Sequence, residues 1–357
     1  MGYSRSIYVL LNTMNTKPTI LSTMVAAISF CFPCLSPAQT VPVTVDNFIR
    51  AESDMYFAGI LKEGDGVIGK FNHRREPADV NKQTVIRLNR DTLYSSGLFD
   101  LDSGSVTITL PDAGTRFRSM MIVNQDHYVQ AVIYEPGSHI IDRETVGTRY
   151  AVVAIRTLVD PANAEDVKQV HALQDAIKVE QPGGPGKFER PEWDAASQTK
   201  VRDALLALGS TTTRFRRAFG TKAQVDPIYH LIGTAAGWGG NPDKDATYLN
   251  FTPSKNDGTT AYHLVVRDVP VDAFWSISVY NAMGYFEPNK ENSYSVNNLT
   301  AKKNADGSVS IQFGGAADGA SNYLPITPGW NYTVRLYRPR KEILDGTWQF
   351  PEPQALK

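Results

Sequence analysis

Cysteine is scarce in this chain of 357 residues: it has two, Cys31 and Cys34, and both lie within the first 38 positions. Their Cys-x-x-Cys spacing resembles a redox motif, but it falls inside a stretch typical of a secretory signal. Phe30 and Pro33 precede the two cysteines, whereas a lipoprotein site needs a small residue there. A chain cut after Ala38 would contain no cysteine, so we expect no disulfide in the mature fold.

The first 38 residues have the three parts of a signal peptide. Arg5 and Lys17 supply positive charge, an apolar run covers residues 20–32, and small residues end at Ala38. The apolar run is shorter than the ~20 residues that span a bilayer, which argues against a permanent membrane anchor. We therefore expect residues 1–38 to be removed and the mature chain to be periplasmic or secreted.

Excess positive charge is also missing. The formal net charge is −1, and removal of residues 1–38 takes away two basic residues and no acidic one, which gives −3. Proteins that follow a phosphate backbone carry clustered Lys and Arg, and no such cluster occurs here. We expect no nucleic acid partner.

Several common catalytic signatures are absent from the sequence. There is no G-x-S-x-G elbow and no glycine spacing of a phosphate loop or dinucleotide site. No two of the six histidines stand four residues apart, as on a zinc-binding helix. The sequence therefore predicts neither a metal nor a cofactor.

The length allows two domains of about 100 to 200 residues each, and the periodicity predicts a mainly β, α+β fold. We expect a signal peptide at 1–38, an N-terminal β-rich domain at 39–160, a helical insertion at 161–225 and a C-terminal jelly-roll-like β-sandwich at 226–357.

These segments follow from apolar periodicity and turn residues. Helical spacing predicts helices at 44–61, from 161 onward, at 193–208 and at 212–219, whereas residues 181–187, with two prolines and three glycines, predict a loop. Strands are predicted at 84–88, 93–100, 106–110, 117–124, 129–134 and 150–155, and then at 262–266, 274–280, 309–313 and 332–337. Asp306 and Gly307 give the strongest hairpin signal.

Ordered blocks of residues resemble a bacterial family of two domains, known as domains of unknown function 1254 and 1214. The blocks that carry the resemblance are 89–94 (NRDTLY), 110–111 (LP), 126–128 (DHY), 274–277 (FWSI), 280–281 (YN), 285–286 (YF), 297–298 (NN), 306–307 (DG), 336–339 (LYRP), 344–346 (LDG) and Trp348. The resemblance implies an N-terminal β-rich domain and a C-terminal jelly-roll sandwich, and it implies no mechanism.

Charged residues at strand ends are the candidates for chemistry. Arg90 can present a bidentate fork to an anion, with Asp91 as acid or orienting group and His127 as general base. The alternative is that Arg90 and Asp91 only satisfy each other inside the fold. The neighbouring residues Asn89, Tyr94 and Asp126 are candidate ligand contacts.

Aromatic and amide side chains form a second set of candidates for binding an oxygen-rich ring, because they combine stacking with hydrogen bonds. These are Trp238, Trp275, Tyr280, Asn281 and Asn297. Aromatic residues on alternate strand positions also build cores, and asparagines also make turns, so both interpretations stay open.

We expect an interdomain cleft that acts on an oxygen-rich small molecule or polymer fragment. If the protein is an enzyme, hydrolysis or elimination by acid/base groups is the expected class, which makes it a hydrolase or a lyase. The competing hypothesis is a non-catalytic envelope protein that binds a ligand or forms a homo-oligomer.

Overall fold

The computed structural model describes residues 40–83, 86–212, 216–317 and 319–356. The expected signal peptide lies outside the described residues. Within these ranges the chain is α+β and mainly β, which confirms the fold class predicted from the sequence. The described residues from Thr40 onward belong to one compact unit. The boundaries near residues 160 and 225 and the jelly-roll description stay predictions.

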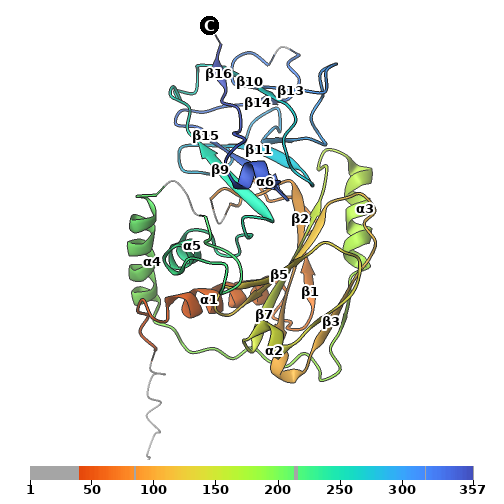
Figure 1. The fold of residues 1–357 in the computed structure, drawn as a ribbon, viewed down its shortest axis with the longest axis vertical. Coiled ribbons are helices and arrows are strands. Elements are labelled where there is room, and N and C mark those ends of the chain that lie inside the picture. The colour runs from red at the N-terminus through yellow and green to blue at the C-terminus, as the bar shows by residue number, and fades with distance from the viewer. Residues whose placement is uncertain (1–39, 84–85, 213–215, 318, 357) are drawn as a thin grey trace, which may run out of the picture. The chain divides into compact units, whose positions relative to one another are not determined.

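Two antiparallel sheets share the first hydrophobic core (Figure 1). The five-stranded sheet has the order β1 (Phe71–His73), β2 (Thr92–Asp100), β7 (Tyr150–Leu158), β4 (Arg118–Asn124) and β5 (Val129–Ile133). The three-stranded sheet has the order β6 (Gly137–Ile141), β3 (Val106–Leu110) and β8 (Lys178–Glu180). Strand β3 alternates buried and half-buried residues, and its buried residues Val106, Ile108 and Leu110 pack against Phe99, Met120 and Ile155 of the larger sheet.

Two further sheets share the second core. One has the order β12 (Ser295–Asn297), β11 (Trp275–Tyr280), β15 (Asn331–Tyr337) and β9 (Ala246–Phe251). The other has the order β14 (Tyr323–Leu324), β13 (Val309–Phe313), β10 (Tyr262–Val266) and β16 (Gln354–Ala355), in which β13 and β14 run parallel. Ile277, Val334 and Leu336 of the first sheet meet Leu264, Ile311 and Phe313 of the second.

The helices are α1 (Phe48–Glu63), α2 (Arg143–Val146), α3 (Ala164–Asp175), α4 (Ala195–Gly209), α5 (Pro227–Gly237) and α6 (Lys341–Leu344), with a 3-10 turn η1 at Leu101–Ser103. α1 packs beside α4 and α5 around Phe48, Leu205 and Ile232. In the described part of the chain, no helix is both long and apolar enough to cross a bilayer.

Helix α5 corrects the sequence prediction. We expected a helix at 212–219, but the described residues 216–219 form turns and bends, and α5 follows them at Pro227–Gly237. Asp226 caps α5 by accepting hydrogen bonds from the backbone N–H groups of Ile228 and Tyr229, and Pro227 occupies the first turn. Asp226 and Pro227 mark the start of this helix in the sequence, but apolar periodicity alone does not take them into account.

The Asp306–Gly307 turn forms, but it does not join two paired strands. Gly307 has a φ of +79°, which suits a tight turn. The N–H of Asn304 donates a hydrogen bond to the carbonyl of Ser308 and closes this turn. The strand after the turn, β13, pairs with β10 and β14, whereas β12 before it pairs with β11. The predicted hairpin is therefore wrong, because the turn carries the chain from one sheet to the other.

Candidate functional site

One face of the sheet β12-β11-β15-β9 is polar although it is buried. Strand β15 places Val334 and Leu336 in the core and turns the alternate residues to the other face. The side chains on that polar face are below 8% exposed: Asn297 of β12, Ser276, Ser278 and Tyr280 of β11, and Asn331, Thr333, Arg335 and Tyr337 of β15. Buried polar groups need partners, so something polar must cover this face.

The segment Arg87–Asp91, directly before β2, covers it. Arg87 donates through Nη1 to Oδ1 of Asn331 at 2.9 Å and to the hydroxyl of Thr333 at 3.1 Å. The Tyr280 hydroxyl donates to the carbonyl of Leu88 at 2.8 Å. Residues from the two halves of the chain therefore meet at this surface.

Arg335 is the central cation of the polar face. Its Nη2 donates to the carbonyls of Arg87 and Leu88 at 2.9 and 3.1 Å and to the Tyr280 hydroxyl at 2.6 Å, while Nη1 donates to Ser278 at 2.8 Å. Burial alone would lower the pKa of Arg335, but the nearby Tyr280, Tyr337 and Asp91 outweigh it and raise that pKa. Arg335 is therefore a fixed positive charge.

Tyr94 and Arg156 approach the same place from the N-terminal sheet. They are opposite each other across strands β2 and β7, and the Arg156 guanidinium carbon lies 5.4 Å from the centre of the Tyr94 ring. Arg156 is 7% exposed and donates through Nη2 to the carbonyl of Gly239 at 3.1 Å. Its charge thus faces the Tyr94 phenol inside the protein.

Amide side chains join these residues to tyrosines of the C-terminal sheet. Nδ2 of Asn89 donates to the Tyr337 hydroxyl at 3.1 Å and lies 3.4 Å from that of Tyr94. Nδ2 of Asn241 donates to the Tyr248 hydroxyl at 2.8 Å. We call the residues Asn89, Tyr94, Arg156, Tyr248 and Tyr337 the Tyr–Arg centre. Parts of the side chains of Asn89, Tyr94 and Tyr248 are exposed, whereas the phenol oxygens of Tyr94 and Tyr248 are desolvated by burial.

The pKa values of two phenols of the Tyr–Arg centre are shifted in opposite directions. Burial would raise the pKa of Tyr94, but the positive charge of Arg156 and hydrogen bonds from Asn89, Arg156 and Thr92 outweigh it and lower that pKa. Burial, followed by Tyr248 and Tyr94, raises the pKa of Tyr337 well above its ordinary value. Titratable groups whose pKa values are pushed apart are typical of acid and base partners.

Arg90 and Asp91 do not form the mutual ion pair that the sequence allowed. Arg90 donates to the carbonyl of Ala78, and its guanidinium lies 5.1 Å from the ring centre of Tyr294. Asp91 is 1% exposed and accepts a hydrogen bond from Nδ2 of Asn297 at 3.2 Å. Its Oδ2 is buried with no hydrogen-bond partner among the described residues. Asp91 therefore belongs to the buried polar face.

His127 makes no hydrogen bond to a residue of the Tyr–Arg centre within the described residues, but it shares Gly239 with Arg156, and both of its ring nitrogens are engaged. The N–H of Gly239 donates to Nε2 at 2.8 Å, so the proton resides on Nδ1, which is 2.7 Å from the Thr234 hydroxyl. The side chain is fully buried, and burial followed by the neighbouring His230 lowers its pKa well below the ordinary value. A role as general base would require one of these bonds to break.

Other predicted residues have local roles in the structure. Asp126 accepts from Nε and Nη2 of Arg50 at 3.1 and 2.5 Å. Trp238 stacks on His127 with ring centres 5.2 Å apart and donates to the Ser53 hydroxyl. Asn281 accepts from the N–H groups of Met283 and Tyr285 in a turn. Trp275 packs in the second core.

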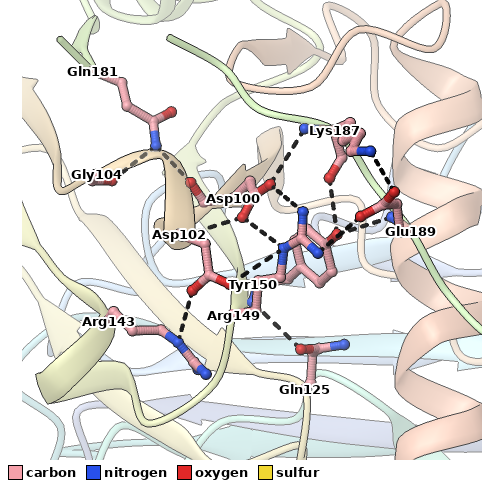
Figure 2. Close-up of polar contacts among 10 residues, drawn as sticks. All are labelled: Asp100, Asp102, Gly104, Gln125, Arg143, Arg149, Tyr150, Gln181, Lys187 and Glu189. Carbon is pink, nitrogen blue, oxygen red and sulfur yellow. Dashed lines mark hydrogen bonds and ion pairs between the residues drawn. The ribbon is translucent and has the colours of Figure 1, made fainter. Parts of the chain in front are cut away.

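Arg149 lies at the centre of an ionic network whose role is structural (Figure 2). Its Nε and Nη2 bind both oxygens of Asp100 at 3.0 and 2.9 Å, and Nη1 binds Glu189 at 2.9 Å. Gln181 donates to the carbonyls of Asp100 and Gly104. These contacts fasten the predicted loop 181–187 to the end of β2, and they leave Asp100 with both carboxylate oxygens occupied.

Asn89 and Tyr94 were predicted from the sequence. The residues that were not predicted as part of the site are Arg156, Tyr248, Arg335 and Tyr337. A signal was present for the arginines, since each is a lone charge in an apolar β run, at 152–159 and at 332–337. A charge at such a position is buried and must be paired. Among the described residues, no group of three or more His, Cys, Asp or Glu side chains is arranged to hold a metal ion.

Two protein-family models match parts of the chain. Residues 68–140 match the protein family of unknown function DUF1254, and residues 247–341 match the protein family of unknown function DUF1214. Asn89 and Tyr94 lie in the first match, and Tyr248 and Tyr337 lie in the second. No curated protein matches the chain.

Two solved structures resemble the chain. The VPA0106 protein from Vibrio parahaemolyticus has 17% identity and a TM-score of 0.70, over 88% of this chain and 98% of its own. A putative uncharacterized protein from Burkholderia cenocepacia has 12% identity and a TM-score of 0.50, over 88% and 87%. At such identities the likeness shows the fold alone. Along the chain, the DUF1254 match therefore precedes the DUF1214 match, in the order that the sequence blocks predicted.

Proposed function

We propose that the Tyr–Arg centre binds an oxygen-rich small molecule or polymer fragment and acts on it by acid/base elimination. The observation that carries the proposal is the convergence of Tyr94 and Tyr337, from different sheets, on the amide of Asn89. Such a pair supplies one phenol whose pKa is lowered and one whose pKa is raised, beside the charge of Arg156.

The reaction that suits these groups removes a proton from carbon and breaks a carbon–oxygen bond. The Tyr94 phenolate takes a proton from the carbon next to a carboxylate, and Arg156 stabilises the developing negative charge. The bond to oxygen at the next carbon then breaks, and the Tyr337 phenol protonates the leaving oxygen. The products are an unsaturated carboxylate and an alcohol, and no oxidant or reductant is needed.

Elimination is favoured over glycoside hydrolysis by the kinds of side chain present. Hydrolysis of glycosides generally uses two carboxylic acids on either side of the scissile bond. The five residues of the Tyr–Arg centre are phenols, an amide and a guanidinium, and they include no carboxylic acid. The carboxylate of Asp91 is buried and is bound at Oδ1 by Asn297. We therefore take an acidic sugar unit with a leaving group next to its acidic carbon as the expected substrate class.

The experiment is to incubate the purified chain with a panel of uronate-containing oligosaccharides and to follow the ultraviolet absorbance of the new conjugated double bond. We expect Tyr94→Phe to lose at least 100-fold in rate, because general acid–base groups contribute about 10²–10⁴. Tyr229→Phe is the matched control, since Tyr229 lies on α5, a helix that contributes no residue to the Tyr–Arg centre. Equal rates for Tyr94→Phe and wild type would exclude Tyr94 as the base.

A non-catalytic binding role is the second candidate. It is favoured by the internal bonds of Asn89, Asn241 and Arg156, which already occupy these polar groups. This role predicts saturable binding of the same oligosaccharides without product, and weaker binding by Tyr94→Phe. A further proposal is that the chain is exported, which is supported by the signal-like residues 1–38 and the absence of cysteine after them.

A further inference from the structure

The solvent-facing side of the sheet β14-β13-β10-β16 contains a hollow of about 350 Å³. Strands β10 and β13 turn Leu264 and Ile311 into the core, so His263 and Gln312 fall on the opposite face. The residues that line the hollow are His263, 302–304, 310–312 and 320–322. The hollow lies in the C-terminal half and does not include any residue of the Tyr–Arg centre.

Side-chain amides fix the walls of the hollow. Nδ2 of Asn322 donates to the carbonyls of Lys302 and Ser310 at 2.9 and 2.8 Å, and its Oδ1 accepts from the N–H of Lys302 at 2.8 Å. Nδ2 of Asn304 donates to the hydroxyls of Ser308 and Ser310, both at 2.9 Å. These bonds hold the backbone of Lys302 against β13, and none of them involves its ammonium group.

The charged side chains that line the hollow are those of Lys302 and Lys303, and His263 lies beside them. Lys302 and Lys303 are exposed, and in the described ranges neither forms an ion pair. His263 is half-buried, and no side-chain hydrogen bond involves it within the same ranges. None of the described lining residues is acidic, although the chain as a whole has a net charge of −1. The lining of the hollow therefore carries positive charge, whereas the whole chain is slightly negative.

We propose that this hollow binds a small anion with two or more negative charges, of the size of a sugar phosphate or a tricarboxylate. The volume is at the small end of the range of about 300–1,000 Å³ that is typical of small-molecule sites. Two ammonium groups and an imidazole supply donors for several oxygens at once, and ammonium is a well-used phosphate and carboxylate binder. The site is separate from the proposed elimination.

The test is isothermal titration of the mature chain at low ionic strength with three probes: inorganic phosphate, citrate and glucose. We expect saturable binding of phosphate or citrate, no binding of glucose, and an affinity that falls as sodium chloride is added, because salt screens exposed charges. Binding of phosphate alone identifies a phosphoryl ligand, and binding of citrate alone identifies a carboxylate ligand. The double variant Lys302→Gln, Lys303→Gln is expected to bind at least tenfold more weakly.

Lys200→Gln is the matched control, because Lys200 is an exposed lysine on α4. It should bind as wild type does, and so should Tyr94→Phe, which tests the elimination and not this site. The exposed lysines contribute little to the fold, so circular dichroism of the double variant should equal that of the wild type. Absence of saturable heat with both phosphate and citrate, or equal affinity of the double variant and wild type, would overturn the proposal.

Discussion

Asn297 donates a hydrogen bond to Oδ1 of Asp91, a residue 206 positions earlier in the chain. Both side chains are buried, and Asp91 makes no second hydrogen bond through Oδ2 within the described residues. The carboxylate therefore depends on a single side-chain donor from the other half of the protein. This contact makes the joint between the DUF1254 and DUF1214 regions sensitive to one amide group.

Replacement of that amide gives the first prediction. Asn297→Leu should lower the free energy of unfolding by about 3 kcal/mol, because it leaves a buried carboxylate without its donor. The change is measured by urea unfolding. Asp91→Asn in the same background should restore part of the loss, because it removes the buried charge. If Asn297→Leu unfolds at the same urea concentration as wild type, the contact does not stabilise the joint.

A second prediction concerns the cation of the polar face. Arg335→Lys should lower the free energy of unfolding by about 3 kcal/mol or more, because lysine keeps the charge but cannot reach the two carbonyls, Tyr280 and Ser278 together. The control is Arg340→Lys, which alters an exposed pair with Asp272 and should leave the stability nearly unchanged, because solvent screens exposed ion pairs. Equal thermal melts for the two variants would contradict the central position of Arg335.

The third prediction is a pH dependence that originates at His127. Its pKa in the folded state lies well below the ordinary 6.5 because of burial and the neighbouring His230, so below about pH 6.5 the unfolded chain binds a proton that the folded chain does not. Stability should therefore be complete above about pH 6.5 and fall as the pH is lowered below it.

Urea midpoints measured from pH 8 to pH 5 test this dependence. His127→Gln should be less stable than wild type at pH 8 but lose less stability on acidification. His139→Gln, at a half-buried position on β6, serves as the control and should keep the wild-type slope. A wild-type slope in His127→Gln would assign the acid sensitivity to another group.

Export supplies the fourth prediction. If residues 1–38 are removed, the mature N-terminus should be Gln39 and the stability of the processed protein should not respond to reductant, because no cysteine remains. N-terminal sequencing of the protein from a cell envelope fraction tests the first point, and a thermal melt with and without thiol tests the second. Recovery of a chain that still begins at Met1 would contradict the cleavage.

The elements that the sequence predicted well are those with strong local signals. Strands β3, β10 and β13 have the predicted bounds because their buried residues alternate with half-buried or exposed ones, and turn residues mark their ends. The predicted strand at 84–88 is wrong over its described residues 86–88, which are not in a strand; of these, Arg87 and Leu88 cover a polar sheet face. The pattern of apolar residues does not distinguish a strand from an irregular segment whose side chains and carbonyls bond to a neighbouring sheet.

The Tyr–Arg centre was predictable only in part for a similar reason. Asn89 and Tyr94 stood out as neighbours within one block, but Tyr337 is 248 positions after Asn89. Arg156 becomes the neighbour of Tyr94 only through the register of β2 and β7. The alternation of side chains along a strand predicts which residues share a face. It does not predict which distant strand is the neighbour, so the pairing of Asn89 with Tyr337 could not be predicted from the sequence.

The Arg87–Asp91 segment has a consequence for the time course of folding. Its partners on β15 lie up to 248 residues later in the chain, and synthesis proceeds at about 5–20 residues per second. The residues that will cover the polar sheet face are thus made tens of seconds before that face exists. During this interval Arg87 and the carbonyl of Leu88 are hydrated. The nascent N-terminal sheets must stay soluble while these polar groups still lack their partners on β11 and β15. Completion of the joint is therefore a late event, timed by the last strands of the protein.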